Sequence, residues 1–204
     1  MQYCNNCWLN KRYFEVVEKT VLPVLKKYRV APGQVSFAGF IFAVLVPFAF
    51  GANFGLGVLS LALSVFAYSL DGYYANNLGL TSKKGLFWNS LLGSLSEGFY
   101  LAGIWVVFFE QGEWLFASGM CVLFASILCA LIGYIQLKAK ELGITCRSGF
   151  MNRMARSVYL VFWMIVTMIF SLKDGILWIG LTLFLGLCLI SVVQISLQVN
   201  NKLE

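Results

Sequence analysis

The sequence contains no histidine and few charged residues. None of its 204 residues is His, and Asp, Glu, Lys and Arg together make up 12%, about half the ~25% typical of soluble domains. The absence of histidine excludes a Ser-His or Cys-His nucleophile and a histidine-ligated haem. The shortage of charge, together with a hydrophobic content of 60%, excludes an ordinary soluble globule and predicts an integral membrane protein.

Proline is also scarce, and cysteine follows no framework pattern. Three prolines and 19 glycines without a repeat exclude a collagen-like or disordered chain. Most of the six cysteines lie in or beside apolar stretches, where a thiol behaves as a small hydrophobe. Cys4 and Cys7 form a C-x-x-C pair, but no second pair or histidine follows at metal-ligand spacing, so we interpret this pair as incidental and not as a zinc site.

Long apolar stretches account for most of the chain. A membrane-spanning helix needs about 20 predominantly apolar residues. Residues 1–30 carry charges throughout and do not resemble a signal peptide. The sequence therefore predicts an all-α fold with two parts, an N-terminal segment over residues 1–30 and a bundle of six transmembrane helices within residues 31–204. The expected spans are 33–52, 54–75, 85–109, 114–136, 155–171 and 175–197.

The N-terminal segment has the pattern of an interfacial helix. Over residues 8–29, apolar side chains recur at helical intervals among lysines and arginines, which is typical of an amphipathic helix lying on a membrane surface. Pro23 is expected to kink this helix because proline lacks a backbone donor. The alternative interpretation is a solvated helix belonging to a different fold.

Positive charges are distributed unevenly among the loops. Of the Lys and Arg residues outside the spans, Lys173 is the only one expected on one side of the membrane. On that same side, the connection between the third and fourth spans carries Glu110 and Glu113 and no cation. The asymmetry of Lys and Arg predicts that both termini are cytoplasmic. The cations expected on the cytoplasmic side are the basic residues before the first span, Lys83, Lys84, Lys138, Lys140, Arg147, Arg153, Arg156 and Lys202.

Two carboxylates interrupt the apolar spans. An aspartate at the centre of a span costs at least ~2.5 kcal/mol, so Asp71 and Glu97 each need a partner or a function. Asn89, Gly93 and Glu97 recur every four residues and therefore share one face of the third span. This polar stripe is compatible with a packing seam that contains a buried hydrogen bond and equally with a ligand cavity.

The residues around these carboxylates resemble the signature of the CDP-alcohol phosphotransferases, D-x-x-D-G-x-x-A-R-x8-G-x3-D-x3-D. The similarity covers roughly residues 20 to 195. It implies a six-span transferase fold in which the signature aspartates hold two divalent metals, which bind the pyrophosphate of a CDP-linked lipid while an alcohol attacks it. The matching segments are Asp71-Gly72-x-x-Ala75, Ser82-x-x-Gly85, Asn89 and Gly93 in the signature, Pro32-x3-Ser36-x2-Gly39 before it and Gly149-x3-Arg153-x2-Arg156 after it.

The chain departs from this signature at three of the four aspartates. Tyr68 stands at the first position, Asn89 at the third and Gly93 at the fourth, so only Asp71 is kept, and Asn76 replaces the family's arginine. Two divalent cations ~3.5 to 4 Å apart repel each other unless carboxylates offset their charge. Asp71 alone is therefore expected to be at most a residual metal ligand. The loss at Gly93 also removes the residue that the resemblance implies as general base.

Other charged residues of the region have alternative interpretations. Glu97 lies one turn from Gly93 with its side chain directed toward the helix N-terminus, so it either substitutes partly for the missing carboxylate or, lacking an obvious cation, is protonated and hydrogen-bonds a neighbouring helix. We favour the second interpretation. Lys83 and Lys84 either bind anions or only set topology. Arg153, Arg156 and Lys138 are the residues expected to bind lipid phosphate.

Three functions are compatible with these features. The favoured hypothesis is a catalytically inactive relative of the phospholipid synthases that needs no metal and whose cavity binds a lipid or nucleotide or docks a partner. The alternative is an active transferase with a rearranged Mg2+ or Mn2+ site. A small transporter or channel is disfavoured because the helices show no paired inverted interruptions. The expected nucleotide-binding residues are Asp71, Gly72, Ala75 and Gly85, and the residues of the alternative active site are Asp71, Asn89 and Glu97.

The expected partners are membrane lipids and either a second copy of the chain or another membrane protein, and no nucleic acid. The resemblance implies a homodimer formed through transmembrane helices. The small-residue seam Ser94-x3-Gly98-x3-Ala102 on the third span offers a surface where two helices approach closely.

Overall fold

The computed structural model describes residues 32–77, 83–112, 114–143, 151–170 and 174–203. These residues form helices and no strands, so the predicted all-α fold is confirmed. The predicted interfacial helix over residues 8–29 and the Cys4–Cys7 pair lie outside the described residues. The described helices are α3 (Pro32–Ala52), α4 (Phe54–Asn77), α5 (Lys83–Gln111), α6 (Leu115–Glu141), α7 (Arg153–Ile169) and α8 (Asp174–Leu203).

Each of the six predicted spans corresponds to one helix, although the ends differ. Five helices, α3, α4, α5, α6 and α8, are long and apolar enough to cross a membrane. Helix α7 is shorter, with 17 residues or about 25 Å at 1.5 Å per residue. It begins two residues before the predicted span because the side chain of Asn152 caps it, accepting a hydrogen bond of 2.8 Å from the amide of Ala155.

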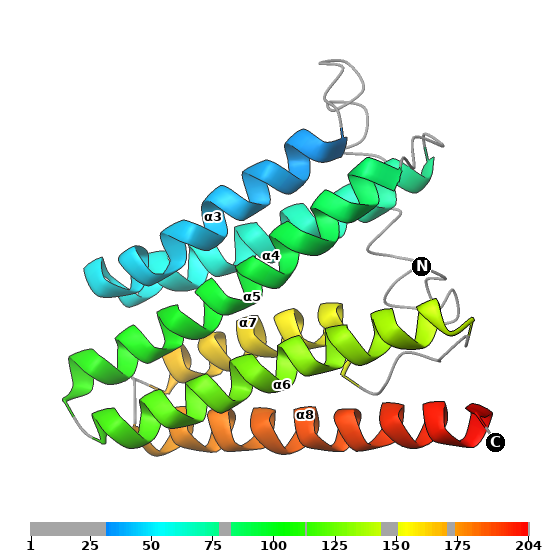
Figure 1. Cartoon of the computed structure of the whole chain (residues 1–204). Helices are drawn as coiled ribbons and strands as arrows, with labels where there is room; N and C mark the ends of the chain where they lie inside the picture. The colour runs from blue at the N-terminus through cyan, green and yellow to red at the C-terminus, as the bar shows by residue number, and fades with distance from the viewer. Residues whose placement is uncertain (1–31, 78–82, 113, 144–150, 171–173, 204) are drawn as a thin grey trace.

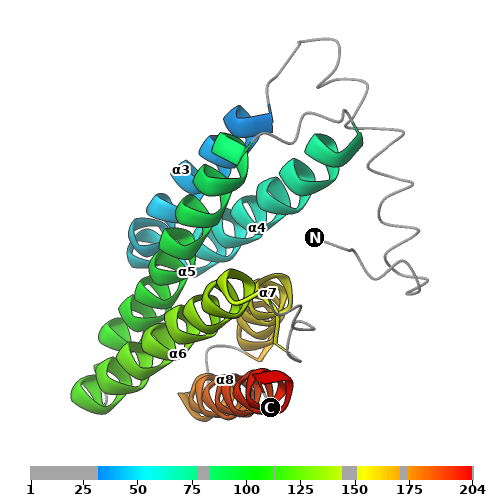
Figure 2. The same cartoon turned by 45° about the vertical axis from the view of Figure 1, so that its right-hand side comes forward.

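The helices form two groups of three. Figures 1 and 2 show α3, α4 and α5 side by side in one group and α6, α7 and α8 in the other. Helices α5 and α6 connect the groups, and α4 packs against α7 across them. The end of α4 and the starts of α5 and α7 lie at the same end of the bundle, on the right in Figure 1. The polar residues discussed below come from these helix ends.

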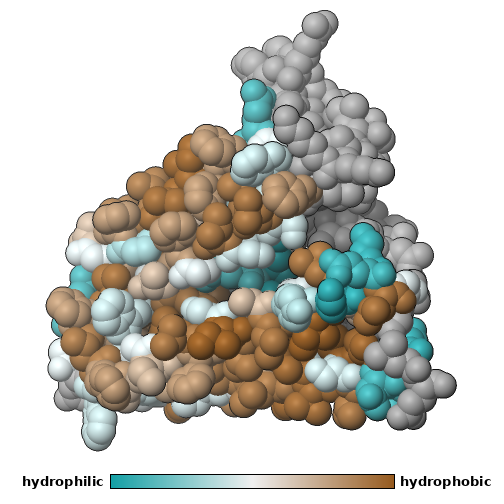
Figure 3. Space-filling model, in the orientation of Figure 1, coloured by the Kyte–Doolittle hydropathy of each residue, from teal (hydrophilic) through white to brown (hydrophobic). Residues whose placement is uncertain are grey.

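The distribution of apolar side chains is that of a membrane protein. Large side chains such as Phe50, Tyr100 and Phe184 are fully buried between helices, yet Phe48 and Phe116 remain 72% and 82% exposed. Exposed apolar side chains in such number suit contact with lipid and not with water. Figure 3 shows hydrophobic side chains over most of one face, with hydrophilic ones gathered between the two groups of helices and at the right-hand end. The protein is an integral membrane protein.

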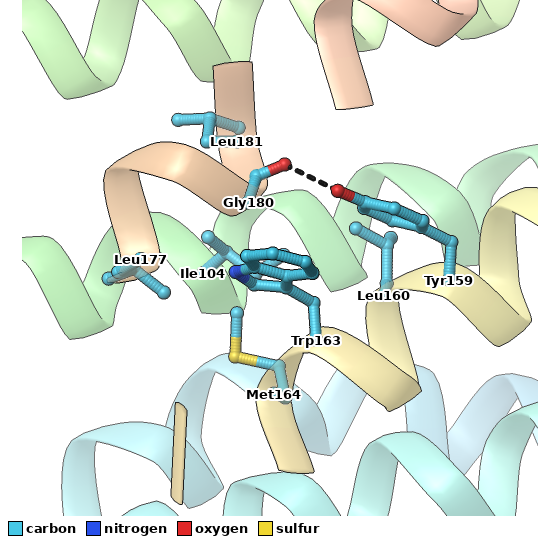
Figure 4. Close-up of a pocket in the computed structure, with 8 residues that line it drawn as sticks. All are labelled: Ile104, Tyr159, Leu160, Trp163, Met164, Leu177, Gly180 and Leu181. Carbon is cyan, nitrogen blue, oxygen red and sulfur yellow. Dashed lines mark hydrogen bonds between the residues drawn. The ribbon is translucent and has the colours of Figure 1, made fainter. Parts of the chain in front are cut away.

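Two aromatic residues fix α7 against α8. The hydroxyl of Tyr159 donates to the carbonyl of Gly180 at 2.9 Å, and the indole nitrogen of Trp163 donates to the carbonyl of Ile176 at 2.9 Å. A β-carbon on Gly180 would overlap the Trp163 indole, so glycine allows this close approach. The cavity beside these residues, shown in Figure 4, measures about 10 Å³, the lower limit for one water molecule. It is a packing contact that positions α7.

Candidate functional site

The polar stripe of α5 faces the interior of the bundle. Gly93 and Glu97 are buried and Asn89 is half-buried. Tyr68 and Asp71 of α4 hydrogen-bond to α5, and two arginines reach the stripe from α7. The structure therefore brings together the four signature positions and the two arginines that the sequence singled out.

Asp71 is held by neutral donors from two helices. Its Oδ2 atom accepts a hydrogen bond from the hydroxyl of Ser36 on α3 and another, of 2.6 Å, from Nδ2 of Asn89 on α5. The side chain is 3% exposed. Because an ionised carboxylate only accepts hydrogen bonds, Asn89 directs its amide nitrogen, and not its carbonyl oxygen, toward Asp71.

The side chains of α4 form a polar face next to Asp71. The hydroxyl of Tyr68 hydrogen-bonds Oγ of Ser96 at 2.9 Å, and Ser64 bridges the carbonyl of Gly39 and the hydroxyl of Tyr100, each at 2.6 Å. Sequence reasoning missed Ser64, Ser96 and Tyr100. A signal for Ser64 was present, because it precedes Asp71 by seven residues and therefore lies on the same helical face.

The guanidinium of Arg153 occupies the space beside Gly93. A β-carbon built on Gly93 would coincide with Nη2 of Arg153. Nη1 and Nη2 make long hydrogen bonds of 3.4 and 3.5 Å to the backbone carbonyl of Asn89. The guanidinium carbon also lies 5.4 Å from the centre of the Tyr68 ring, within range of a cation–π contact. Arg153 thus contacts three of the four signature positions, those that have lost their aspartates.

Glu97 pairs with the second arginine. Nη2 of Arg156 donates to both carboxylate oxygens of Glu97 at 3.0 Å, and Nη1 donates to the carbonyl of Met151 at 3.1 Å. Both charged side chains are buried. The favoured interpretation, a protonated Glu97 that only hydrogen-bonds a neighbouring helix, rested on the lack of an obvious cation in its own span, and the structure shows that another helix, α7, brings Arg156 beside it. Arg153 fills the space next to Gly93 into which Glu97 would have to extend to replace the lost aspartate.

The remaining predicted site residues lie near the same end of the bundle. Gly72 and Ala75 belong to the last turns of α4, and Gly85 to the first turn of α5. Lys138, near the end of α6, is exposed and forms an ion pair of 2.8 Å with Glu141. The predicted roles of these residues in nucleotide binding, and of Lys138, Arg153 and Arg156 in phosphate binding, stay predictions.

The residues present do not fit the two divalent metals that the resemblance implies. Within the described ranges, no three Asp, Glu, Cys or His side chains are grouped so that they could hold a metal ion. One oxygen of Asp71 already accepts two hydrogen bonds, and a cation, Arg153, stands where the fourth aspartate would project. A positive charge at that point repels a divalent cation.

Comparison with known proteins supports the resemblance at the level of the fold. No protein-family model matches the chain. It is 25% identical to an uncharacterised protein of Aquifex aeolicus over 196 residues, covering 95% of this chain and 94% of that protein. It is 24% identical to the archaetidylinositol phosphate synthase of Methanothermobacter thermautotrophicus over 158 residues, 77% of each.

Solved structures give the same result. The phosphatidylinositol phosphate synthase of Mycobacterium tuberculosis with CDP-DAG bound superposes with a TM-score of 0.72 at 20% identity, covering 88% of this chain and 91% of that chain. The same enzyme in complex with manganese and citrate gives 0.73 at 19% identity, covering 88% and 87%. The chain therefore has the fold of the phosphatidylinositol phosphate synthases, and the resemblance to the CDP-alcohol phosphotransferase family expected from its sequence is confirmed.

Proposed function

We propose that the protein is a catalytically inactive relative of the phospholipid synthases that binds a CDP-linked lipid. The observation that carries this proposal is the state of Asp71, the one signature carboxylate that remains, whose Oδ2 accepts hydrogen bonds from Ser36 and Asn89. The fold is shared with an enzyme whose structure contains CDP-DAG, which supports binding of that lipid class.

The geometry argues against transfer of the phosphate-bearing group. Metal-assisted phosphoryl transfer relies on two cations that stabilise the attacking and leaving oxygens, and the carboxylates needed to hold them are missing at Tyr68, Asn89 and Gly93. A general base must lie within hydrogen-bond reach of the alcohol whose proton it takes. Gly93 has no side chain, and Glu97 is engaged by Arg156 through both oxygens.

A turnover assay tests this proposal. Purified protein is mixed with CDP-diacylglycerol, Mg2+ or Mn2+ and a panel of alcohols including inositol phosphate, and released CMP is measured beside the mycobacterial synthase as positive control. We expect no CMP above background, together with saturable binding of CDP-diacylglycerol. Metal-dependent CMP release that disappears in Asp71→Ala would instead support the active transferase, with Asp71, Asn89 and Glu97 as its site.

We further propose that the end of the bundle carrying Asp71 faces the cytoplasm together with both termini. Lys138, Lys140 and Lys202 lie at the ends of α6 and α8, on the same side as Arg153 at the start of α7, whereas Glu110 lies at the opposite end of α5. This agrees with an excess of Lys and Arg on the cytoplasmic side. A reporter fused after the last residue, active only in the cytoplasm, measures the orientation.

The outer face of α5 and α6 supports a homodimer. Gly98 is exposed, and nothing lies within 4 Å of a β-carbon built on it. An open groove of about 360 Å³ lies between the two helices, and four of the residues that line it, Gly98, Ala102, Gly119 and Ser126, are small enough for the backbone of a second helix to approach closely. We propose that the same helices of a second copy fill it. The groove is lined by Gly98, Ala102 and Trp105 of α5 and by Gly119, Val122, Leu123 and Ser126 of α6.

A further inference from the structure

The position of the Arg153 guanidinium requires glycine at residue 93. The guanidinium of Arg153 lies where the first side-chain atom of any residue other than glycine at position 93 would be. No small adjustment of a side chain at position 93 avoids this overlap, because the β-carbon is fixed by the backbone. Arg153 holds its position only because residue 93 is glycine, and a carboxylate at position 93 and this placement of Arg153 exclude each other.

Arg153 is held in place without being neutralised. Its neighbours are the ring of Tyr68 at 5.4 Å and the carbonyl of Asn89 at 3.4 to 3.5 Å, which orient a guanidinium but carry no net charge. In the described part of the chain, no carboxylate forms an ion pair with Arg153. Arg156 differs, since Glu97 offsets its charge.

A half-buried cation that forms no ion pair points to an anionic ligand. Removing an unpaired charge from water is costly, and an external anion reduces that cost. The guanidinium has five N–H donors, and its two long bonds to Asn89 leave others available. Its planar fork matches two oxygens of a phosphate group. The hydrogen bonds to Asp71 come from Ser36 and Asn89, and none of them comes from Arg153.

We infer that Arg153 is a built-in cation that takes the place of divalent metal, so that the diphosphate of a CDP-linked lipid binds here without any metal ion. This inference rests on the proposed function, since it assumes that a CDP-linked lipid is bound. It adds that Arg153 holds the diphosphate and that glycine at position 93 leaves the space which the guanidinium occupies.

Binding measured with and without metal tests the inference. The full chain is reconstituted in phosphatidylcholine nanodiscs, and the affinity for CDP-diacylglycerol is measured in EDTA and in Mn2+. We expect the two dissociation constants to agree within about twofold, and Arg153→Gln to weaken binding by about tenfold in both buffers, the effect of losing charge-assisted hydrogen bonds. Lys140→Gln, which removes an exposed cation at the same end of the bundle, serves as matched control and retains the affinity.

Substitution of Gly93 tests the inference independently, because Arg153 itself is unchanged. Gly93→Ala is expected to displace the guanidinium and to weaken binding as Arg153→Gln does. Gly133→Ala on α6, whose β-carbon meets nothing within 4 Å, is the control that retains binding. Arg153→Lys, which keeps the charge and loses the fork, is expected to fall between Arg153→Gln and the wild type.

The outcomes separate the inference from the proposed function. Binding that disappears in EDTA and returns with Mn2+, without CMP release, overturns the inference and leaves the proposed function standing. Equal affinity of the wild type, Arg153→Gln and Gly93→Ala overturns it as well. CMP release, or no binding of CDP-diacylglycerol in either buffer, overturns the proposed function itself. A manganese titration followed by electron paramagnetic resonance, in which the wild type is expected to leave the free-ion signal unchanged, provides a readout that does not depend on the lipid.

Discussion

At the scale of single residues, the two arginines of α7 differ in what balances their charge. Arg156 is buried and paired with Glu97 through two hydrogen bonds of 3.0 Å, whereas Arg153 contacts only neutral groups. The resemblance implies four aspartates that hold two divalent cations. Here only Asp71 remains of the four, and Arg153, which forms no ion pair within the described residues, lies beside Gly93.

Breaking the buried pair should destabilise the protein strongly. Removing one partner of a buried ion pair leaves an uncompensated charge, which costs about 3–5 kcal/mol. We expect Glu97→Gln to lower the midpoint of thermal unfolding in detergent markedly. The double variant Glu97→Met/Arg156→Met should recover most of the loss, because apolar side chains of similar size fill the same space without a charge. If the losses of the single variants Glu97→Met and Arg156→Met add up to that of the double variant, a direct pair is contradicted.

The residues of the site were more predictable than their contacts. The positions Asp71, Asn89 and Gly93 follow from spacing along the chain, because helical periodicity fixes which residues share a face. The contact of Glu97 with Arg156 joins residues 59 positions apart, and no spacing within one helix indicates which helix it faces. The contact of Arg153 with Gly93 could not be predicted from the sequence for the same reason. The lack of a side chain at position 93 indicated only that space was available there.

At the scale of elements, α7 connects packing to the site. It is the shortest described helix, and its first residue is Arg153. Hydrogen bonds from Tyr159 and Trp163 to the backbone of α8 fix its position. Hydropathy predicted the existence of all six helices. It did not predict their ends, because α6 and α8 continue to Glu141 and Leu203, beyond the apolar stretch that the hydrocarbon core requires.

Adding one methyl group at the α7–α8 contact should show how much this packing contributes to the stability of the protein. Gly180→Ala places a β-carbon where the indole of Trp163 lies, and overpacking of this kind typically costs about 1–3 kcal/mol. We expect a lower unfolding midpoint in detergent. Gly186→Ala on the same helix, where the added carbon meets nothing within 4 Å, is the matched control and should unfold at or slightly above the wild-type temperature. Equal midpoints for the two variants would refute the close contact.

At the scale of the whole molecule, the site and the proposed dimer surface lie on opposite faces of the same helix. On α5, Asn89, Gly93 and Glu97 face inward, while Ser94 and Gly98 are exposed. The sequence predicted the inner set as a polar stripe, for which it left open a role in packing or in ligand binding, and the outer set as a separate seam of small residues. The structure separates them, so a change on the outer face is expected to leave the inner contacts intact.

The dimer surface can therefore be tested without disturbing the site. Gly98→Leu projects a branched side chain into the groove between α5 and α6, where a second copy would need to approach closely. We expect crosslinking of the wild type in membranes to give a dimer, and Gly98→Leu to reduce it strongly while the protein stays folded. Gly133→Leu, on α6 but outside the residues that line the groove, should crosslink as the wild type does. Undiminished crosslinking of Gly98→Leu would place the interface on another face, because a leucine cannot fit between two helices that meet at a glycine.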